Sequence, residues 1–173
     1  MTIYYFEKPD TLNKNQPVEI KNSDHQTIAK IMRTAAKILY LKEGSAFASK
    51  NILEQECAYL TLELGWSGKA DPVIVYHDKK NQREIAFEAV PDSPHILHIH
   101  SKEAEFPIDM LELSTSGSLL IKFHQQESAF IQEVQTDSSV SYLQVKILVD
   151  NTNMPDNFFL LSYFIFHLIK NEC

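Results

Sequence analysis

The chain has 173 residues, a net charge of −7, four glycines and two cysteines. This length fits a single domain, residues 1–173, that can bury a core of its own. Because general phosphate neutralisation needs a basic surface, the acidic balance excludes nucleic acid as an expected partner.

The N-terminal residues show neither a secretory signal nor a spanning segment, because the mixed run from Met1 to Phe6 leads directly to Glu7 and Lys8. We therefore expect a cytoplasmic protein without a transmembrane segment. Cys57 and Cys173 fit neither a disulfide framework nor a metal knuckle, and free thiols are expected.

Charge is unevenly distributed along the chain. Residues 1–50 hold eight Lys and Arg against five Asp and Glu, a net charge of +3, which leaves −10 for the remaining residues. A local basic patch is one interpretation, and a solvated mixed-charge surface is the commoner one.

The N-terminal third has two interpretations. Ile3, Tyr5 and the segment 18–20 resemble strands separated by prolines. In the segment 23–42 the apolar residues have helical spacing, with Ser23 or Asp24 as a cap, although 27–33 also fits a strand that returns from a turn. Local propensity favours the helix. Residues 46–56 are predicted to be a polar connection with one helical turn.

From about residue 58 to 149, short apolar-alternating runs are separated by turn residues at regular spacing. This pattern is typical of an antiparallel sheet that closes into a sandwich or barrel, with six or seven strands in this part of the chain. The cleanest runs are Met110–Leu113 and Leu119–Phe123.

Within the segment 156–172, the run 158–169 is apolar on all sides, apart from Ser162 and His167. A helix of this kind must be enclosed, and at 1.5 Å per residue its apolar run is too short for the ~30 Å hydrocarbon layer. Asn153 or Asp156 is the expected cap, and the expected core residues include Phe159, Tyr163 and Phe166. We therefore predict a mainly β fold, a many-stranded antiparallel barrel around a hydrophobic C-terminal helix. The alternative is an α+β open sheet with helices on one face.

Three stretches of the chain carry a family resemblance. They are the aromatic opening 4–9 followed by 17–22, the ladder of strands in the middle, and Met154-Pro155-Asp156 before the apolar helix. Together they resemble a single tubby-like domain, as in LURP-one-related proteins, phospholipid scramblases and small bacterial homologues. The resemblance implies about a dozen strands around the buried helix, and it implies that 27–33 is a strand. In this family some members bind phosphoinositides, some are linked to lipid scrambling, and many have no assigned activity.

Histidines form the densest titratable cluster. The cluster is His95, His98 and His100. On a strand His98 and His100 would share one face, as two ligands of a divalent metal, with His77 or His124 to complete the set. A solvent-facing pair without a metal is the commoner arrangement.

Other candidates have equally ordinary alternatives. His167 fits a buried general base or, more often, a hydrogen-bonded core histidine. Glu103, Glu105 and Asp109 fit a cleft or a solvated acidic rim. The aromatic residues near turns and strand ends fit a partner-binding surface or the core; they are Tyr4, Tyr5, Phe6 and Trp66.

No catalytic motif is present, so we expect a non-enzymatic binding module without a cofactor. Its expected ligand is a protein partner or an anionic lipid headgroup, and the candidate ligand-binding residues are Lys30, Arg33 and Lys37 in the basic third. The alternative function is an acidic protein-interaction module, either a secretion chaperone or a toxin-neutralising immunity protein, which captures a basic partner.

Overall fold

The structure is a computed structural model. It describes residues 1–9, 16–37, 43–63, 73–91, 97–103, 105, 107–113, 116–135, 140–148 and 154–172. These residues form twelve strands and one helix, α1 (Asp156–Glu172). The strands are Thr2–Glu7 (β1), Val18–Asn22 (β2), Thr27–Lys37 (β3), Glu43–Asn51 (β4), Glu56–Glu63 (β5), Val73–Asp78 (β6), Arg83–Ala89 (β7), His98–Ser101 (β8), Ile108–Glu112 (β9), Leu119–Phe123 (β10), Gln126–Gln135 (β11) and Ser141–Ile147 (β12).

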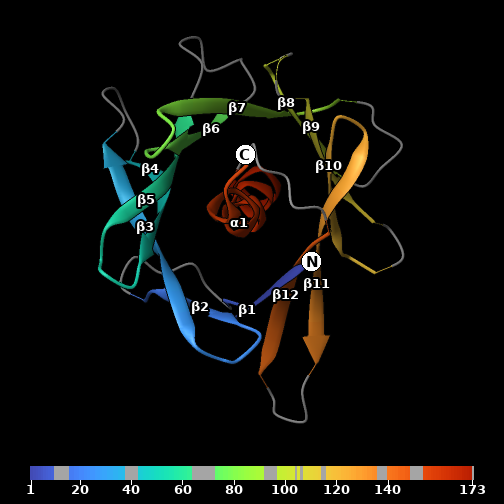
Figure 1. Ribbon diagram of the computed structural model, residues 1–173. Helices are drawn as coiled ribbons and strands as arrows, with labels where there is room; N and C mark the ends of the chain where they lie inside the picture. Colours follow the sequence, from blue (N-terminus) through green and yellow to red (C-terminus); the bar gives the residue numbers. More distant parts are fainter. Residues whose placement is uncertain are drawn as a thin grey trace.

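Each strand pairs antiparallel with the strands that precede and follow it in the chain, and β1 closes the ring against β12 (Figure 1). The predicted closed barrel is therefore confirmed, and the open sheet is excluded. Closure gives each strand a neighbour on either side over at least part of its length, so no strand is an edge along its whole length.

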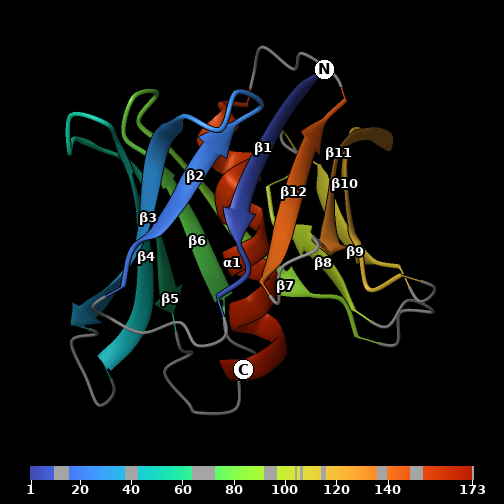
Figure 2. The same cartoon turned by 90° about the horizontal axis from the view of Figure 1, so that it is seen from below.

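Helix α1 runs along the inside of the barrel, surrounded by strands (Figure 2). Phe159 is only 2 % exposed, Phe166 is also buried, and Tyr163 is partly buried against the same core. Ser162 is buried too, and its hydroxyl donates to the Phe158 carbonyl one turn earlier at 2.8 Å. This bond satisfies the polar group within the helix, so Ser162 costs the apolar interior little. Among the described residues, no helix has both the length and the apolar character to cross a membrane.

Aromatic rings join the helix to the barrel wall. Phe164 lies 4.8 Å from Phe47 and 6.0 Å from Phe6, measured between ring centroids. Six residues earlier in the helix, Phe158 packs edge-on against Tyr76 at 5.3 Å. These distances fall in the range at which aromatic pairs attract one another beyond their burial.

Polar contacts hold both ends of α1. At the end where the helix begins, the Tyr4 hydroxyl donates to the Asp156 carboxylate, and the Ser49 hydroxyl donates to the Asn157 side chain at 2.8 Å. Burial and the bond to Asp156 raise the pKa of Tyr4 above its usual value, so it remains a donor. At the other end, the Lys170 ammonium donates to buried Glu112 at 2.6 Å. We call these the proximal and distal ends of the barrel.

Of the two interpretations of residues 27–33, the strand that the resemblance implies is the one observed, within β3. One local prediction was wrong, since residues 46–51 of the predicted polar connection belong to β4. The register of β3 with β2 and β4 supplies backbone partners on both sides, while Ala29 and Ile31 face the core. Tertiary pairing thus overrides the helical spacing of the segment, as often happens with weak local propensity. The residues 38–42, Trp66 and Asn153 lie outside the described residues.

We predict that Phe164→Ala lowers the free energy of unfolding by about 3–5 kcal/mol, because a fully buried ring is replaced by a cavity between helix and wall. Urea denaturation followed by circular dichroism measures the change. Leu148→Ala is the control, since Leu148 is exposed and should change the stability by less than about 0.5 kcal/mol. Equal effects of the two substitutions would contradict the enclosed position of α1.

Candidate functional site: a cleft between β1 and β2

The barrel wall is loosest between β1 and β2. These strands share two register pairs, Tyr4 with Asn22 and Tyr5 with Lys21, and then diverge toward the distal end (Figure 2). If the register continued, Glu7 would stand opposite Glu19, and Pro9 opposite Pro17. Like charges directly opposite destabilise a strand pair, and proline cannot donate to a ladder. The sequence therefore opposes closure of the wall at this point.

A cavity of about 340 Å³ opens where the two strands separate. This volume lies in the range of small-ligand sites. The lining residues come from β1, β2, β3, β4 and β12 and from the ends of the connection between β1 and β2. They are Phe6, Glu7, Lys8, Pro9, Gln16, Pro17, Val18, Glu19, Lys21, Ile31, Arg33, Phe47 and Tyr142.

The floor of the cleft combines apolar side chains with a guanidinium group. Phe6, Ile31 and Phe47 are buried in the core and supply the apolar part. Arg33 pairs directly with Phe47 in the β3–β4 register, so both side chains point into the barrel. The Arg33 guanidinium carbon lies 5.9 Å from the centre of the Phe47 ring, a cation–π distance that holds the charge over an apolar surface.

The rim of the cleft carries charges of both signs. The Lys8 ammonium donates to the Glu133 carboxylate of β11 at 2.7 Å. The bond from Lys8 and a second from Ser141 hold the pKa of Glu133 below its usual value. Glu7, Glu19 and Lys21 complete the rim, and Glu19 accepts a bond from the Thr27 hydroxyl at 3.3 Å.

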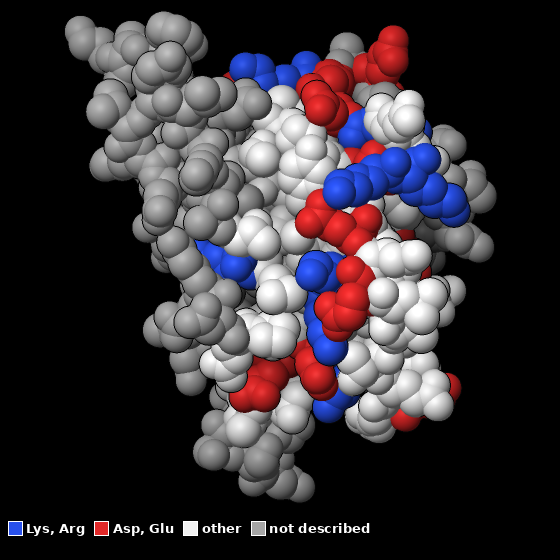
Figure 3. All heavy atoms as spheres, turned by 90° about the vertical axis from the view of Figure 1, so that its left-hand side faces the viewer, with Lys and Arg blue, Asp and Glu red and all other residues white. Residues whose placement is uncertain are grey.

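The residues predicted to bind a ligand do not form one patch. Lys30 and Arg33 are three residues apart on a strand, which places them on opposite faces, so only Arg33 lines the cleft. On the outer face Lys30 stands opposite Lys50, and Glu54 lies 3.1 Å from the first and 3.9 Å from the second. The Lys37 side chain lies outside the described part of the structure. Charges of both signs interleave on the side of the barrel that Figure 3 shows.

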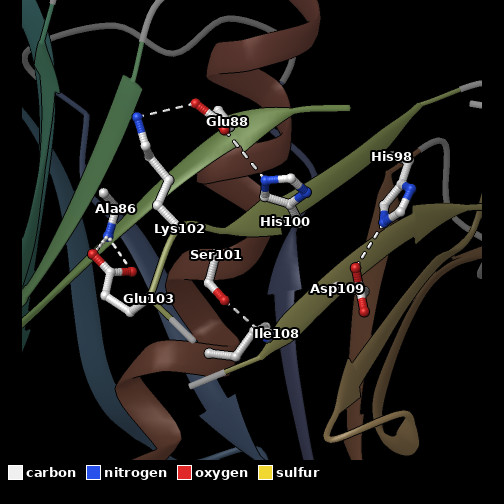
Figure 4. A network of polar contacts seen from close by, with 9 residues as sticks. All are labelled: Ala86, Glu88, His98, His100, Ser101, Lys102, Glu103, Ile108 and Asp109. Atoms are coloured by element: carbon white, nitrogen blue, oxygen red, sulfur yellow. Dashed lines mark hydrogen bonds and ion pairs between the residues drawn. The ribbon is translucent and has the colours of Figure 1, made fainter. Parts of the chain in front are cut away.

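The histidines of β8 point outward on either side of buried Ile99 (Figure 4). Their ring centroids are 6.4 Å apart. His98 Nε2 lies 2.7 Å from Asp109, and His100 Nε2 lies 3.3 Å from Glu88, which also pairs with Lys102 at 3.2 Å. Each ring therefore has a carboxylate neighbour of its own.

The other histidines lie elsewhere. His77 bonds Thr61 and Glu84, and His124 packs on Phe123 in the β10–β11 turn, whereas His95 falls outside the described residues. In the described part of the chain, no three His, Cys, Asp or Glu side chains group around a metal position. Metal binding by His98 and His100 stays a prediction, which zinc titration of the melting temperature tests.

The remaining candidates have mainly structural contacts. The Glu103 carboxylate accepts two bonds from the Ala86 amide (Figure 4). Glu105 is exposed. His167 is half-buried, with its ring 6.2 Å from that of Tyr163. Of the N-terminal aromatics, Tyr4 and Phe6 belong to the core, while half-buried Tyr5 stacks on the His25 ring at 6.0 Å. Cys57 is a free thiol, and Cys173 lies outside the described residues.

The cleft itself was missed in the sequence, although a signal for it exists. Glu7 and Glu19, like Pro9 and Pro17, are placed symmetrically about residue 13. In an antiparallel pair centred at residue 13, Glu7 would face Glu19 and Pro9 would face Pro17. Neither facing pair supports a β-ladder, so the pairing of the two strands cannot extend this far.

Comparison of the chain with known protein families, with curated proteins and with solved structures finds no match. The tubby-like resemblance therefore stays a prediction. Any function inferred for the chain therefore rests on the geometry of the cleft.

We predict that the contribution of Glu133 to stability depends on pH. Because its pKa is lower in the folded state, the contribution is present above the unfolded pKa of about 4.3 and is lost as pH falls through the folded pKa. Both partners are more than a third exposed, so solvent screening keeps the effect below about 1 kcal/mol.

The measurement is the melting temperature of Glu133→Gln against the unchanged protein from pH 7 to pH 3. The gap between them should shrink as the pH falls. Glu127→Gln, on an exposed residue of the same strand, is the control. A gap that stays constant over this range would show that the Lys8 contact contributes nothing.

Proposed function

We propose that the chain is a non-enzymatic, cytoplasmic binding module of the tubby-like type, and that its ligand is a segment of a protein partner held in the cleft between β1 and β2. The observation that supports this function is the cavity of about 340 Å³, in which an apolar floor lies beside the Arg33 guanidinium. A site of this composition suits a ligand with an apolar group next to an anionic one.

The rim charges favour a protein segment over a lipid headgroup at this position. A polyanionic headgroup needs a clear excess of cations, whereas Glu7 and Glu19 stand at the same rim as Lys8 and Lys21. A protein segment can present both signs of charge and an apolar side chain, so it can complement all three parts of the cleft.

The proposal predicts that a photo-crosslinking amino acid at Lys21 couples the protein to a specific partner in an extract of the source organism. Arg33→Glu should lower the yield by tenfold or more, because it places a carboxylate where an anionic group of the partner is to bind. Lys122→Glu is the matched control, since Lys122 lies outside the cleft on β10.

Mass spectrometry identifies the coupled protein and its point of attachment. Equal yields from crosslinkers at Lys21 and Lys122, or an Arg33→Glu yield equal to that of the unchanged protein, would refute the cleft as the binding site. The alternative function, an acidic module that captures a basic partner, predicts a strongly basic coupled protein attached through many surface positions.

A second candidate function, contact with an anionic lipid surface, is favoured by one other feature. Ile52 and Leu53 form the tip of the β4–β5 hairpin and are 68 % and 71 % exposed. Lys30 and Lys50 lie behind this tip, with Glu54 between them. An apolar tip with flanking lysines can enter the interfacial layer of a membrane while the ammonium groups meet anionic headgroups.

A second hairpin shows that the turn itself does not require apolar residues. In the β4–β5 hairpin, the Asn51 side chain accepts bonds from the amides of Leu53 and Gln55, and Glu54 has a positive φ of 60°. The β2–β3 hairpin repeats the arrangement. There Asn22 accepts from Asp24 and Gln26, and His25 has a φ of 61°. Its tip is Ser23 and Asp24, so the same turn forms with polar residues.

The lipid candidate predicts flotation with vesicles of phosphatidylcholine and phosphatidylserine. Replacing the tip by that of the other hairpin, Ile52→Ser with Leu53→Asp, should reduce binding about tenfold or more, because each buried aliphatic side chain contributes about 1.5–3 kcal/mol. Lys30→Glu should also weaken binding, and added salt should lower it further.

The reciprocal exchange, Ser23→Ile with Asp24→Leu, is the control for the turn and should leave the fold unchanged. If the Ile52→Ser, Leu53→Asp protein floats as well as the unchanged protein, the lipid candidate is wrong.

A further inference from the structure

Backbone direction in β1 follows from one hydrogen bond. The Lys8 amide donates to the Ser141 carbonyl of β12 at 2.9 Å. Because successive backbone groups of a strand point to opposite sides, the amide and carbonyl of Glu7 point the other way, toward β2. The backbone groups of Tyr5 have the same orientation, and Tyr5 is paired with Lys21. Those of Glu7, two residues later, face the cleft.

The opposite wall has the same property. Since Lys21 of β2 is paired with Tyr5, the backbone groups of Glu19, two residues earlier, also point toward β1. The β-bulge near this position places its extra residue on β3, between Thr27 and Ala29, so the alternation along β2 is regular. The cleft is thus bordered by two strand edges whose backbone groups face each other.

Both strands are held in place by their outer neighbours. β1 pairs with β12 as far as Glu7, and β2 pairs with β3 from Val18 onward. The two edges are therefore preformed, and an added strand need not first order them. Exposed strand edges with free directions for hydrogen bonds are the surfaces to which extended peptides add.

The side chains that line the cleft determine which side chains an added strand needs. Alternate residues of an added strand point into the barrel, where they meet first the floor formed by Phe6, Ile31 and Phe47. Arg33 follows Ile31 by two residues on the same inner face of β3. An apolar residue separated by one position from an acidic residue matches this spacing.

We propose that the cleft binds an extended segment of a protein partner by strand addition, with backbone hydrogen bonds to the Glu7 and Glu19 edges, an apolar side chain on the floor and, two residues away, a carboxylate at Arg33. The inference rests on the proposed function, of which it states the mode of binding and the class of ligand. Main-chain recognition provides affinity, and the apolar and acidic side chains provide specificity.

The test uses a synthetic nine-residue peptide of threonines that contains one leucine and, two positions later, one glutamate. Fluorescence anisotropy of the labelled peptide with the full chain measures its Kd. N-methylation of those alternate amides that face one wall should weaken binding tenfold or more, because it removes donors without changing the side chains. Glutamate to glutamine in the peptide should weaken binding to the unchanged protein and leave binding to Arg33→Gln unaffected.

A charge cycle tests whether the open seam is needed. Glu7→Lys and Glu19→Lys each place opposite charges across the cleft, which favours closure of β1 on β2, so each single variant should bind the peptide less and melt at a higher temperature. The double variant restores like charges and should recover binding. Circular dichroism of all three variants checks that the barrel is retained.

Amide hydrogen exchange gives the independent readout. Bound peptide should slow exchange at the amides of Glu7 and Glu19 and leave that of Lys122 on β10 unchanged. Strand addition is refuted if no peptide of this pattern binds, or if N-methylated and unmodified peptides bind equally. These results leave crosslinking from Lys21 unaffected, so a failure of the binding mode is distinguishable from a failure of the proposed function.

Discussion

The structure depends on the need to cover a helix that has no polar side. Every face of α1 must be taken from water, and only a wall that surrounds it can do so. Twelve antiparallel strands provide this wall, because each turns one apolar face inward and has backbone partners on both sides. The polar contacts of Asp156 and Lys170 then hold the two ends of the helix in position along the barrel axis.

The strand pairs of this wall are not equally extensive, and the weakest joint is the one between β1 and β2. Where β1 meets β2, two register pairs close the ring, and the charges and prolines that follow oppose any extension. The barrel accommodates the defect because the helix and the outer neighbours of both strands supply enough packing elsewhere. The same seam lies over core aromatics and presents a guanidinium group and two backbone edges, which is why binding is proposed here and not on the mixed-charge outer surface.

Much of the architecture was predictable from the sequence because it depends on composition over long segments. An all-apolar helix after a series of alternating runs leaves little choice but enclosure, and the barrel followed from that. Local assignment stays open between helix and strand where two periodicities overlap. The apolar residues of β3 satisfy a helical spacing by coincidence, and the strand becomes evident only with its partners β2 and β4 in place.

The site was harder to predict for a related reason. Lys30 and Arg33 share a face in a helix and occupy opposite faces in a strand, so the binding surface could not be defined while the secondary structure stayed open. His98 and His100 do lie on one face, yet their nearest carboxylates come from neighbouring strands, Asp109 and Glu88, which no local pattern reveals. The cleft depends on the register between β1 and β2, a property of a strand pair and not of either strand.

The order of elements along the chain has a consequence for biosynthesis. All twelve strands precede α1, so a ribosome releases the wall before the residues that fill it. Until the helix emerges, the inward side chains of the strands have nothing to pack against, and the nascent sheet resembles the aggregation-prone intermediates from which chaperones protect larger chains. Completion of this core therefore waits until α1 has emerged.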